Sequence, residues 1–366
     1  LSKAVVVLDE AQTLPPHLLD TIVSGLGAIT NKRFGSSVVL CTATQPALNV
    51  VSSTRAFQNV RELAPNPAAT YRELARVEYD IRLSSPTPWT DVAEELREQH
   101  QGLLIVNTTA DARHVAEEVG PDCLHLSTRM CPAHRRDVLR EVHDRLANGE
   151  SCKLVSTQLI EAGVDVDFPV VFRSLAPLDS IAQAGGRCNR EGKFTAGRVV
   201  VFEPEEARLP PGYRTATREA GVLLRGGADL HDPVTFQAYF EALYGKLTDL
   251  DPHGIQGLRR ELRFESVNDA FRMIDDDTVP VIVSAFDAEK VEPILDAFRR
   301  GAATTTDFRA LQPFIVQVRR EKVDAYRKEG WMLPVADEAS GFWSWYGHYD
   351  TRFGLEPRAD DQAYVL

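Results

Sequence analysis

The sequence is poor in cysteine, and the spacing of its cysteines excludes two kinds of site. Its five cysteines form no C-x-x-C pair, so neither a disulfide framework nor a zinc site is predicted. No apolar run approaches the roughly 20 residues that a membrane helix needs. With 366 residues, of which 43% are hydrophobic, the chain can bury the cores of two or three domains. We expect a cytoplasmic, multidomain protein with no membrane partner.

A surplus of positive charge is also missing. The sequence has 41 Lys and Arg against 53 Asp and Glu, a net charge of -12 at pH 7. This argues against a broad basic surface. It does not exclude a protein that grips one nucleic-acid strand along a narrow groove, where hydroxyls, amides and a few cations are sufficient. Residues 299–328 hold a local excess of cations, which fits either such a contact or a solvated amphipathic face.

The chain opens on a short apolar strand that ends in two carboxylates. The run from Ala4 to Leu8 is typical of a buried parallel strand, and Asp9-Glu10-Ala-Gln12 follows it. α/β sheets hold ligands at the carboxyl ends of their strands. Asp9 and Glu10 are therefore placed to hold Mg²⁺ and to orient an attacking water. A strand ending in D-E-x-x is common by chance, so this motif needs support from a second one.

A second motif is Gln183-Ala-Gly-Gly-Arg187-Cys-Asn-Arg190. Its spacing predicts two guanidiniums one helical turn apart beside a glutamine, an arginine-finger arrangement. An arginine delivered to the γ-phosphoryl group of a nucleoside triphosphate accelerates hydrolysis by about 10³ to 10⁵. Arginine suits this role because its planar fork binds phosphate bidentately. The alternative is an ordinary solvated helix, which the acidic pair in the same chain makes less convincing.

A phosphate-binding loop is absent from the sequence. No G-x-x-x-x-G-K-[ST] pattern occurs, so the backbone cradle and the lysine that hold the β- and γ-phosphates are missing. A nucleotide-binding domain would carry that loop upstream of the acidic pair. We therefore expect this chain to be the C-terminal part of a longer protein or one half of a split one.

Two more strand ends carry polar residues. Ser36 to Leu40 is a second buried strand, and its end leads into Thr42-Ala-Thr44-Gln-Pro, whose hydroxyls can link a metal site to a nucleic-acid groove. The other strand begins at Leu154 and leads into the segment that contains Thr157, Gly163 and Asp165. There Thr157 would meet a backbone phosphate, and Asp165 a ribose or the finger arginine.

Alternating apolar patterns predict a doubly wound parallel sheet in the middle of the chain. We expect its strands at 103–106, 123–126, 153–156, 170–172 and 198–202, and its helices near 110–119, 133–146 and 179–187. The aromatic residues between 342 and 353 predict either a small core or a stacking platform for unpaired bases.

Four motifs resemble those of a known enzyme superfamily. D-E-A-Q at 9–12, T-A-T-Q-P at 42–46, S-T-Q-L-I-E-A-G-V-D at 156–165 and Q-A-G-G-R-C-N-R at 183–190 resemble motifs II, III, V and VI of superfamily 2 helicases. Their detailed forms are most similar to the helicase-nuclease of type I CRISPR interference. L-Q-P-F at 311–314 and the segment 349–355 resemble the C-terminal domain of that family. The family's HD nuclease has no counterpart in this sequence.

The resemblance implies an α/β fold in five parts. These are the C-terminal part of a first RecA-like domain (1–60), a linker with short strands (61–98), a complete second RecA-like parallel-sheet domain (99–205), a mostly helical linker region (206–300) and a small α+β accessory C-terminal domain (301–366). In family members a long linker helix precedes the accessory domain.

The resemblance also assigns roles in ATP hydrolysis. Asp9 would hold Mg²⁺ with ATP and Glu10 would orient water, while Gln183, Arg187 and Arg190 would close on the γ-phosphate. The remaining motif residues would couple the nucleotide state to the DNA groove: Gln12, Thr42, Thr44, Gly163 and Asp165.

Polar residues that follow strands of the second domain are the implied DNA contacts. They are Thr108, Thr109, Ser127, Thr128, Arg129 and Thr157. Helix capping is the alternative role for each hydroxyl.

The function implied by the resemblance is ATP-dependent translocation on single-stranded DNA, 3′ to 5′, which unwinds invader DNA in type I CRISPR interference. Its partners would be an RNA-guided surveillance complex of the Cascade type and a nuclease and P-loop portion, covalent or separate. This chain alone would be inactive. Two alternatives stay open: another superfamily 2 helicase, acting on RNA or DNA, and a split subunit that only binds or regulates.

Overall fold

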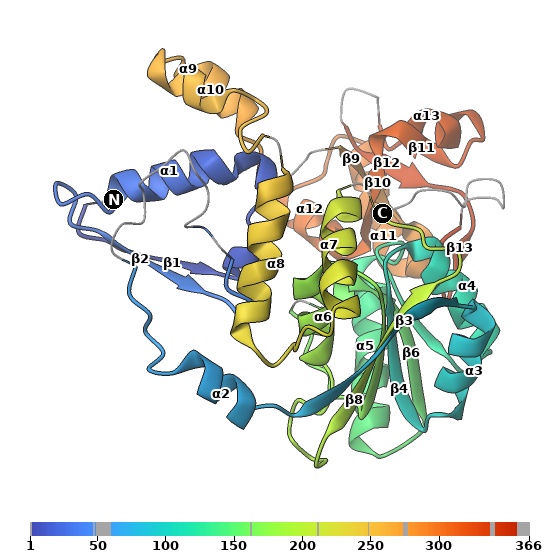
Figure 1. Cartoon of the computed structure of the whole chain (residues 1–366). Helices are drawn as coiled ribbons and strands as arrows, with labels where there is room; N and C mark the ends of the chain where they lie inside the picture. Colours follow the sequence, from blue (N-terminus) through green and yellow to red (C-terminus); the bar gives the residue numbers. More distant parts are fainter. Residues whose placement is uncertain are drawn as a thin grey trace. The chain divides into compact units, whose positions relative to one another are not determined.

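A computed structural model of the protein describes residues 2–46, 48, 60–161, 163–210, 212–247, 249–273, 277–336 and 341–356 (Figure 1). The chain divides into two compact units. Unit 1 joins Leu1–Ala75, Ala176–Ala182 and Thr215–Asp275, and unit 2 joins Arg76–Leu175, Gln183–Arg214 and Asp276–Leu366. None of the helices in the described segments is both long and apolar enough to cross a membrane.

Unit 1 contains a two-stranded parallel sheet. Strand β1 (Val5–Asp9) pairs with β2 (Ser37–Cys41), so the predicted strands are confirmed. Their predicted burial is wrong, because Val5 and Val7 are exposed and no residue of β2 is fully buried. The crossover between them consists of η1 (Ala11–Thr13), η2 (Pro16–Leu18) and α1 (Leu19–Ile29). Parallel strands require such a crossover. Both strands therefore end on the same edge of the sheet.

The rest of unit 1 is helical: α2 (Pro67–Glu73), α7 (Tyr213–Arg225), α8 (Pro233–Lys246), α9 (Ile255–Arg260) and α10 (Phe264–Ala270). The long linker helix expected from the family is two helices here. α7 stops before a pair of glycines, of which Gly227 has a φ of 81°, a conformation that suits glycine. Asp232 then caps α8 through the N–H of Val234, with Pro233 in the first turn.

Unit 2 is built on a six-stranded parallel sheet with the order β3-β8-β7-β4-β6-β5. Figure 1 labels four of its strands: β3, β8, β4 and β6. The strands are β3 (Val77–Thr87), β4 (Gln101–Val106), β5 (Leu124–Leu126), β6 (Cys152–Thr157), β7 (Val170–Ser174) and β8 (Gly197–Pro204). The α/β fold class is confirmed. The predicted linker at 61–98 is wrong in its second half, because β3 pairs with β8 along the edge of this sheet.

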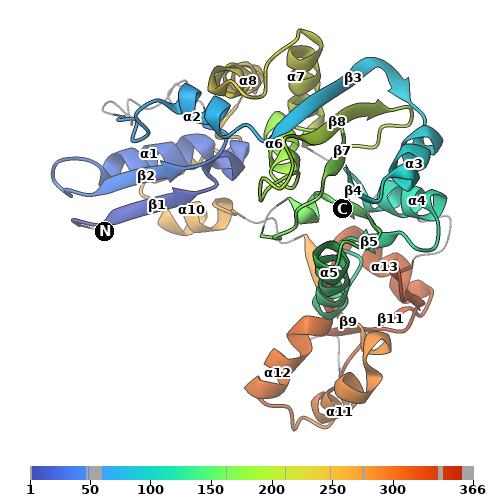
Figure 2. The ribbon, with the colours of Figure 1, turned by 90° about the horizontal axis from the view of Figure 1, so that it is seen from below.

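Helices cover the sheet as a parallel sheet requires. α3 (Trp89–Glu98) and α4 (Thr109–Val119) share one buried cluster with Leu104, Val155 and Phe172. α5 (Pro132–Ala147) packs against β5 and β6 (Figure 2). α6 (Leu178–Gly185) begins in the part of the chain assigned to unit 1, and it ends two residues earlier than its sequence pattern suggests.

A small α+β domain completes unit 2. Its sheet has the order β10-β9-β12-β11, formed by β9 (Thr278–Ile282), β10 (Ile315–Arg319), β11 (Met332–Pro334) and β12 (Trp343–Trp345). Its helices are α11 (Ala288–Arg299), α12 (Thr305–Leu311) and α13 (Arg320–Lys328). Since β9 lies inside this sheet, the domain begins before the expected boundary at 301.

The aromatic residues near the C-terminus mostly fill the core of this domain. Trp343, Trp345, Tyr349 and Phe353 are buried, whereas Tyr346 is exposed and accepts a hydrogen bond from Arg299. Trp343, Trp345 and Tyr349 belong to the core of this domain, whereas Phe353 is buried in the cluster of α3 and α4 in the parallel-sheet domain. Of the two predicted roles, core packing accounts for these four rings.

The hairpin of β13 (Tyr349–Asp350) and β14 (Gly354–Leu355) fastens the small domain to the parallel-sheet domain of unit 2. Arg352 donates to the carbonyls of Ala116, Gly120 and Cys123 at 2.6, 2.6 and 3.0 Å, and so satisfies the C-terminal end of α4. The N–H of Leu355 donates to the carbonyl of Arg129 at 2.9 Å.

Candidate functional site

The acidic pair of unit 1 lies exposed at the carboxyl end of β1. Asp9 is the last residue of the strand, and its Oδ1 accepts the N–H of Glu10 at 3.1 Å. Glu10 has a φ of 53° and a ψ of 47°, a left-handed conformation that is uncommon for a side chain other than glycine. Such strain is often found at functional turns.

Side-chain bonds connect this pair to the second strand. Gln12 Nε2 donates to Glu10 Oε2 at 2.5 Å, and Thr42 Oγ1 donates to Gln12 Oε1. Thr42 Oγ1 also accepts the N–H of Thr44 at 3.0 Å, and the Thr44 side chain is buried. The structure thus brings together the residues to which the sequence assigned coupling in this unit. Their role stays a prediction.

Asp9 fits a magnesium ligand chemically. Mg²⁺ keeps most of its waters and is bound through one or two carboxylates together with phosphate oxygens. The Asp9 carboxylate is exposed at the end of β1, so it is accessible to a hydrated Mg²⁺ ion.

The second motif forms a turn, and the prediction that its arginines lie one helical turn apart is wrong. α6 ends at Gly185, and Asn189 has a φ of 47°. The segment instead pairs with Phe168: the Phe168 N–H donates to the Arg187 carbonyl, and the Asn189 N–H donates to the Phe168 carbonyl, both at 2.9 Å.

The two arginines of the motif have different environments. Arg187 is 8% exposed and donates to the carbonyls of Ile160 and Glu161 at 3.0 and 2.5 Å. The side chain of Arg190 is 46% exposed, and its Nε lies 3.0 Å from Asp165 Oδ1. Arg187 therefore braces the neighbouring loop, and Arg190 presents its charge at the surface. Gln183 is half-buried near the end of α6.

Two residues that the sequence analysis did not select hold the Arg190 turn. Asp167 Oδ1 accepts the N–H of Arg190 at 2.7 Å. The amide of Asn189 is fully buried: its Nδ2 donates to the carbonyls of Arg76 and Phe194 at 2.9 and 2.8 Å. The alternation V-D-V-D, which places Asp167 two residues after Asp165, was the available signal for the first. Nothing in the sequence pointed to Arg76.

Most of the implied DNA contacts of unit 2 are buried or already bonded. Thr108 Oγ1 caps α4 by accepting the N–H of Asp111 at 3.1 Å, as the capping alternative predicts. Thr109 Oγ1 accepts a hydrogen bond from Arg129 Nε at 3.2 Å. Ser127 and Thr157 are buried as well, whereas Thr128 is exposed.

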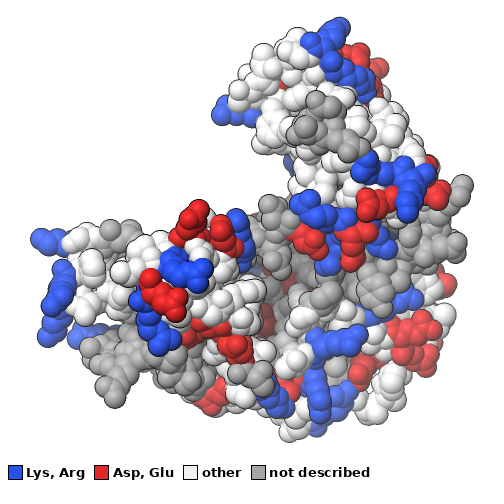
Figure 3. Space-filling model, turned by 90° about the horizontal axis from the view of Figure 1, so that it is seen from above, with Lys and Arg blue, Asp and Glu red and all other residues white. Residues whose placement is uncertain are grey.

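In unit 2, Thr128 lies beside a pocket shared with the small domain. Three cations line the same pocket: Arg129, Arg319 and Lys322. The other lining residues are Thr128, Val316, Gln317, Val318, Tyr326, Trp345 and Leu355. Among the described residues on the molecular face in Figure 3, cations and carboxylates are interspersed.

The remaining motif residues lie in the loop after β6. Gly163 has a φ of 70° and Asp165 is exposed. Only Asp165 among these two makes a described contact with the second motif, through Arg190. Burial raises the pKa of the nearby Cys188 thiol to about 12, so this cysteine stays protonated.

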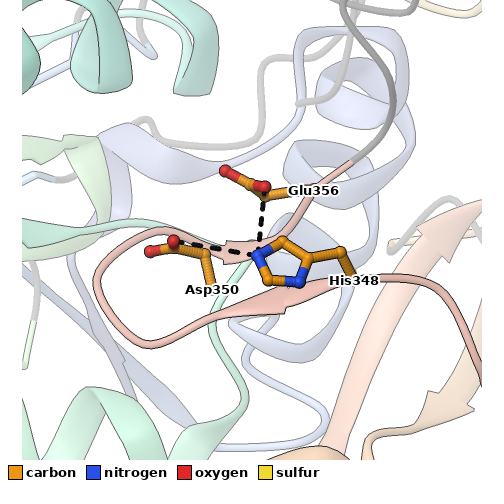
Figure 4. Close-up of side chains that lie close together, drawn as sticks. All are labelled: His348, Asp350 and Glu356. Carbon is orange, nitrogen blue, oxygen red and sulfur yellow. Dashed lines mark ion pairs between the residues drawn. The ribbon is translucent and has the colours of Figure 1, made fainter.

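The hairpin also gathers His348, Asp350 and Glu356 (Figure 4). His348 Nε2 lies 3.4 Å from Glu356 Oε2 and 3.9 Å from Asp350 Oδ2. Glu356 pairs with Arg113 at 2.5 Å, and Asp350 Oδ1 accepts the N–H groups of the following turn. Ion pairing and turn bonds account for this cluster, which strengthens the attachment of the hairpin.

Residues 98–193 match the family model described as CRISPR-associated nuclease/helicase Cas3, C-terminal. Two curated relatives carry the name CRISPR-associated nuclease/helicase Cas3. The one from Haloferax volcanii is 44% identical over 112 residues, 26% of this chain and 12% of the relative. The one from Methanothermobacter thermautotrophicus is 24% identical over 221 residues, 56% of this chain and 26% of the relative. The chain therefore spans about a quarter or less of these relatives.

Solved structures show the same fold. The crystal structure of T. fusca Cas3-ATP has a TM-score of 0.60 at 19% identity, covering 86% of this chain and 47% of that one. A chain from a CRISPR RNA-guided surveillance complex, pre-nicking, has a TM-score of 0.59 at 16% identity, covering 96% and 56%. Residues 98–193 thus match the Cas3-like C-terminal family model, and two curated Cas3 proteins are similar in sequence, which agrees with the resemblance drawn from the motifs. The solved Cas3 structures share the fold of this chain.

Proposed function

We propose that this chain is part of an ATP-dependent translocase that moves 3′ to 5′ on single-stranded DNA and unwinds invader DNA in type I CRISPR interference. The observation that carries the proposal is the turn that presents Arg190. Its backbone is held by Asp167 and its side chain by Asp165 at 3.0 Å. An exposed guanidinium on a fixed turn is what stabilising a γ-phosphoryl group requires.

The residues of unit 1 would supply the other roles in ATP hydrolysis. Asp9 would hold Mg²⁺, which compensates phosphate charge when bound. Glu10 would accept a proton from the attacking water and orient it. Glu10 already accepts a hydrogen bond from Gln12, and Gln12 accepts one from Thr42. This chain of bonds would report the state of the nucleotide to the end of β2.

The finger role is proposed for Arg190 alone. Arg187 donates two hydrogen bonds to buried carbonyls, and breaking them would leave those carbonyls unsatisfied. Among the residues that the structure describes, the Arg190 side chain pairs only with the exposed carboxylate of Asp165, which it would leave on binding phosphate. Exposed ion pairs contribute little to stability, so this exchange costs little.

The DNA strand would contact the carboxyl edge of the parallel sheet in unit 2. Thr128 is exposed there beside Arg319 and Lys322. Thr108 is half-buried and would contact a phosphate while it caps α4. Thr109, Ser127, Arg129 and Thr157, being buried, would shape this edge and contact DNA only after local rearrangement.

The partners would be a P-loop and nuclease portion and an RNA-guided surveillance complex. Val5 and Val7 on β1 are 69% and 58% exposed, although parallel strands are normally covered on both faces. Further sheet from the P-loop portion would cover them. The surveillance complex is proposed because a chain of similar fold is part of one.

The test is ATP turnover by the protein joined with its P-loop portion, measured with no nucleic acid, with single-stranded DNA and with single-stranded RNA. We expect DNA to stimulate turnover most, and duplexes with a 3′ tail to be unwound in preference to those with a 5′ tail. Stronger stimulation by RNA would favour an RNA helicase. Absence of turnover under all three conditions would favour a binding or regulatory subunit.

A further inference from the structure

The core of unit 2 contains an ion pair that the proposed chemistry does not use. Arg173, on β7, is fully buried, and its Nε lies 3.0 Å from Oε1 of Glu161, which is 5% exposed. Burying two charges is expensive, and a well-packed apolar pair at such a position is often as stable or more so. The pair therefore calls for a reason other than stability.

Arg173 joins this loop to the strand end that precedes the implied DNA contacts. Its Nη1 donates to Asn107 Oδ1 at 2.8 Å and to the hydroxyl of Ser174 at 3.1 Å. Asn107 follows β4 and directly precedes the threonine that caps α4. Asn107 Nδ2 in turn donates to the carbonyl of Leu175 at 2.8 Å, so the amide is fixed at both ends.

Glu161 joins the same pair to the arginine motif. Its side chain faces Arg173, while its backbone carbonyl accepts Arg187 Nη2 at 2.5 Å. The loop then continues to Asp165, the partner of Arg190. The buried side chain of Arg173 thus contacts both the loop after β4 and the loop after β6. The loop after β6 in turn contacts the motif that carries Arg190.

We propose that Arg173 is a positioning residue that couples DNA binding at the end of β4 to the placement of Arg190. The inference rests on the proposed function. Because the fork of Arg173 bonds to both loops at once, a displacement of Asn107 by a bound strand would move Glu161, and with it the loop that holds Arg190. An arginine is required because lysine has a single ammonium and cannot span both partners in a fixed geometry.

The experiment uses the full-length protein with its P-loop portion. Removing one charge would leave its partner buried and unpaired, so the main variant is the double substitution Glu161→Gln/Arg173→Gln. Arg173→Lys is the second variant, which keeps the charge but loses the fork. We expect both to retain basal ATP turnover, and the stimulation by single-stranded DNA to fall on the order of tenfold, within the usual range of coupling between two sites. The KM for ATP should stay unchanged.

The matched control is Glu141→Gln/Arg145→Gln, which removes an exposed ion pair of 2.7 Å on α5 and should leave the stimulation intact. Folding is checked by circular dichroism and thermal unfolding. Full DNA stimulation in folded Glu161→Gln/Arg173→Gln would overturn the inference, and so would a failure of both variants to fold, since the pair would then be structural. If the unaltered protein shows no DNA-stimulated turnover, the proposed function itself fails, and that result is distinguishable from either.

Discussion

The two parallel sheets of this molecule are built from similar apolar strands but are buried to different degrees. In unit 1, Val5 and Val7 on β1 are mostly exposed. In unit 2, Leu104, Val155 and Phe172 are almost completely buried beneath α3 and α4. The difference shows that an apolar strand sequence does not by itself ensure that its side chains are buried. Their burial depends on the strands and helices that pack against the sheet.

The polar groups at the strand ends of the two units also differ in how deeply they are buried. Those of unit 1 are exposed carboxylates connected by a few side-chain bonds, from Glu10 through Gln12 to Thr42. Those of unit 2 rest on a buried network around Arg173. A buried network is rigid because breaking it leaves charges without partners. We therefore expect unit 2 to hold its site in place by itself, and unit 1 to need additional chain.

The largest predicted effect is on ATP turnover, and it distinguishes Arg190 from Arg187. In the protein with its P-loop portion, Arg190→Ala should lower ATP turnover by about 10³ to 10⁵, the range known for arginine fingers. Binding of single-stranded DNA and thermal stability should change little, because Arg190 is half exposed. Turnover is measured at saturating ATP, and DNA affinity at several salt concentrations.

The control for this prediction is Arg136→Ala on α5, an exposed arginine outside all motifs. Its turnover should match that of the unaltered protein. Arg187→Ala provides the contrast, since loss of its bonds to buried carbonyls should destabilise unit 2. Turnover by Arg190→Ala within tenfold of normal would contradict the finger assignment.

This pair of arginines shows how far sequence reasoning reached. The strands were predictable because continuous apolar runs are typical of parallel strands. Asp9 ends β1 and Thr42 follows β2, whereas Asp165 lies further along the loop after β6, and the roles of all three stay predictions. The helical spacing of Arg187 and Arg190 misled, since α6 ends at Gly185 and Asn189 adopts a left-handed turn. A spacing of three residues fits a helix and a tight turn equally well.

The second prediction tests the comparison of the two sheets directly. Leu104→Ala in β4 should lower the unfolding free energy of unit 2 by about 2 to 5 kcal/mol, the usual cost of a cavity in a packed core. Val7→Ala in β1 should cost less than about 0.5 kcal/mol in this chain alone, as at other exposed sites. Urea unfolding, followed by hydrogen exchange of β1 and β4 peptides, measures both.

The same substitution should matter once unit 1 is covered. In the protein with its P-loop portion, Val7→Ala should become destabilising, because the side chain would then be buried. A cost for Val7→Ala that is equal with and without that portion would contradict the inference that further sheet covers β1.

The third prediction concerns acid stability, to which His125 in unit 2 and Asp20 in unit 1 contribute with opposite signs. Burial lowers the pKa of His125 in unit 2 to about 3, and the cations Arg352 and Arg129 add to this effect. The unfolded chain, with a histidine pKa of about 6.5, binds more protons between these values. His125 therefore makes unit 2 less stable as the pH falls below 6.5, by about 2 kcal/mol at pH 5.

In unit 1, burial raises the pKa of Asp20. At pH values near its native pKa, the folded state then binds more protons than the unfolded state. The contribution of Asp20 to the unfolding free energy therefore decreases as the pH rises through the native pKa. Urea unfolding at pH 7 and pH 5 measures the effect on unit 2, and His125→Gln should remove most of the pH dependence. An unchanged pH dependence in His125→Gln would show that another group is responsible.

The buried partners of the site could not be read from the sequence. Thr109 and Arg129 were selected as DNA contacts because each follows a strand, yet in the fold they bond to each other. Arg173 was not selected, because a single arginine inside an apolar strand gives no indication of its partners. Such pairs join segments far apart in the chain, and only the register of β4, β6 and β7 brings them together.

The smallest predicted effect tests the link between the two strands of unit 1. Thr42→Val removes the hydroxyl that donates to Gln12 and accepts from Thr44, and should cost about 1 kcal/mol of unfolding free energy. It should also reduce the coupling of DNA binding to hydrolysis, with DNA stimulation of ATP turnover falling on the order of fivefold. Thr30→Val is the matched control, since the Thr30 hydroxyl bonds to the carbonyl of Gly27 at 3.0 Å outside the motifs. Both variants should lose similar stability, and only Thr42→Val should lose stimulation. Equal stimulation in the two would mean that the Gln12 bond supports the fold of unit 1 without transmitting the state of the nucleotide.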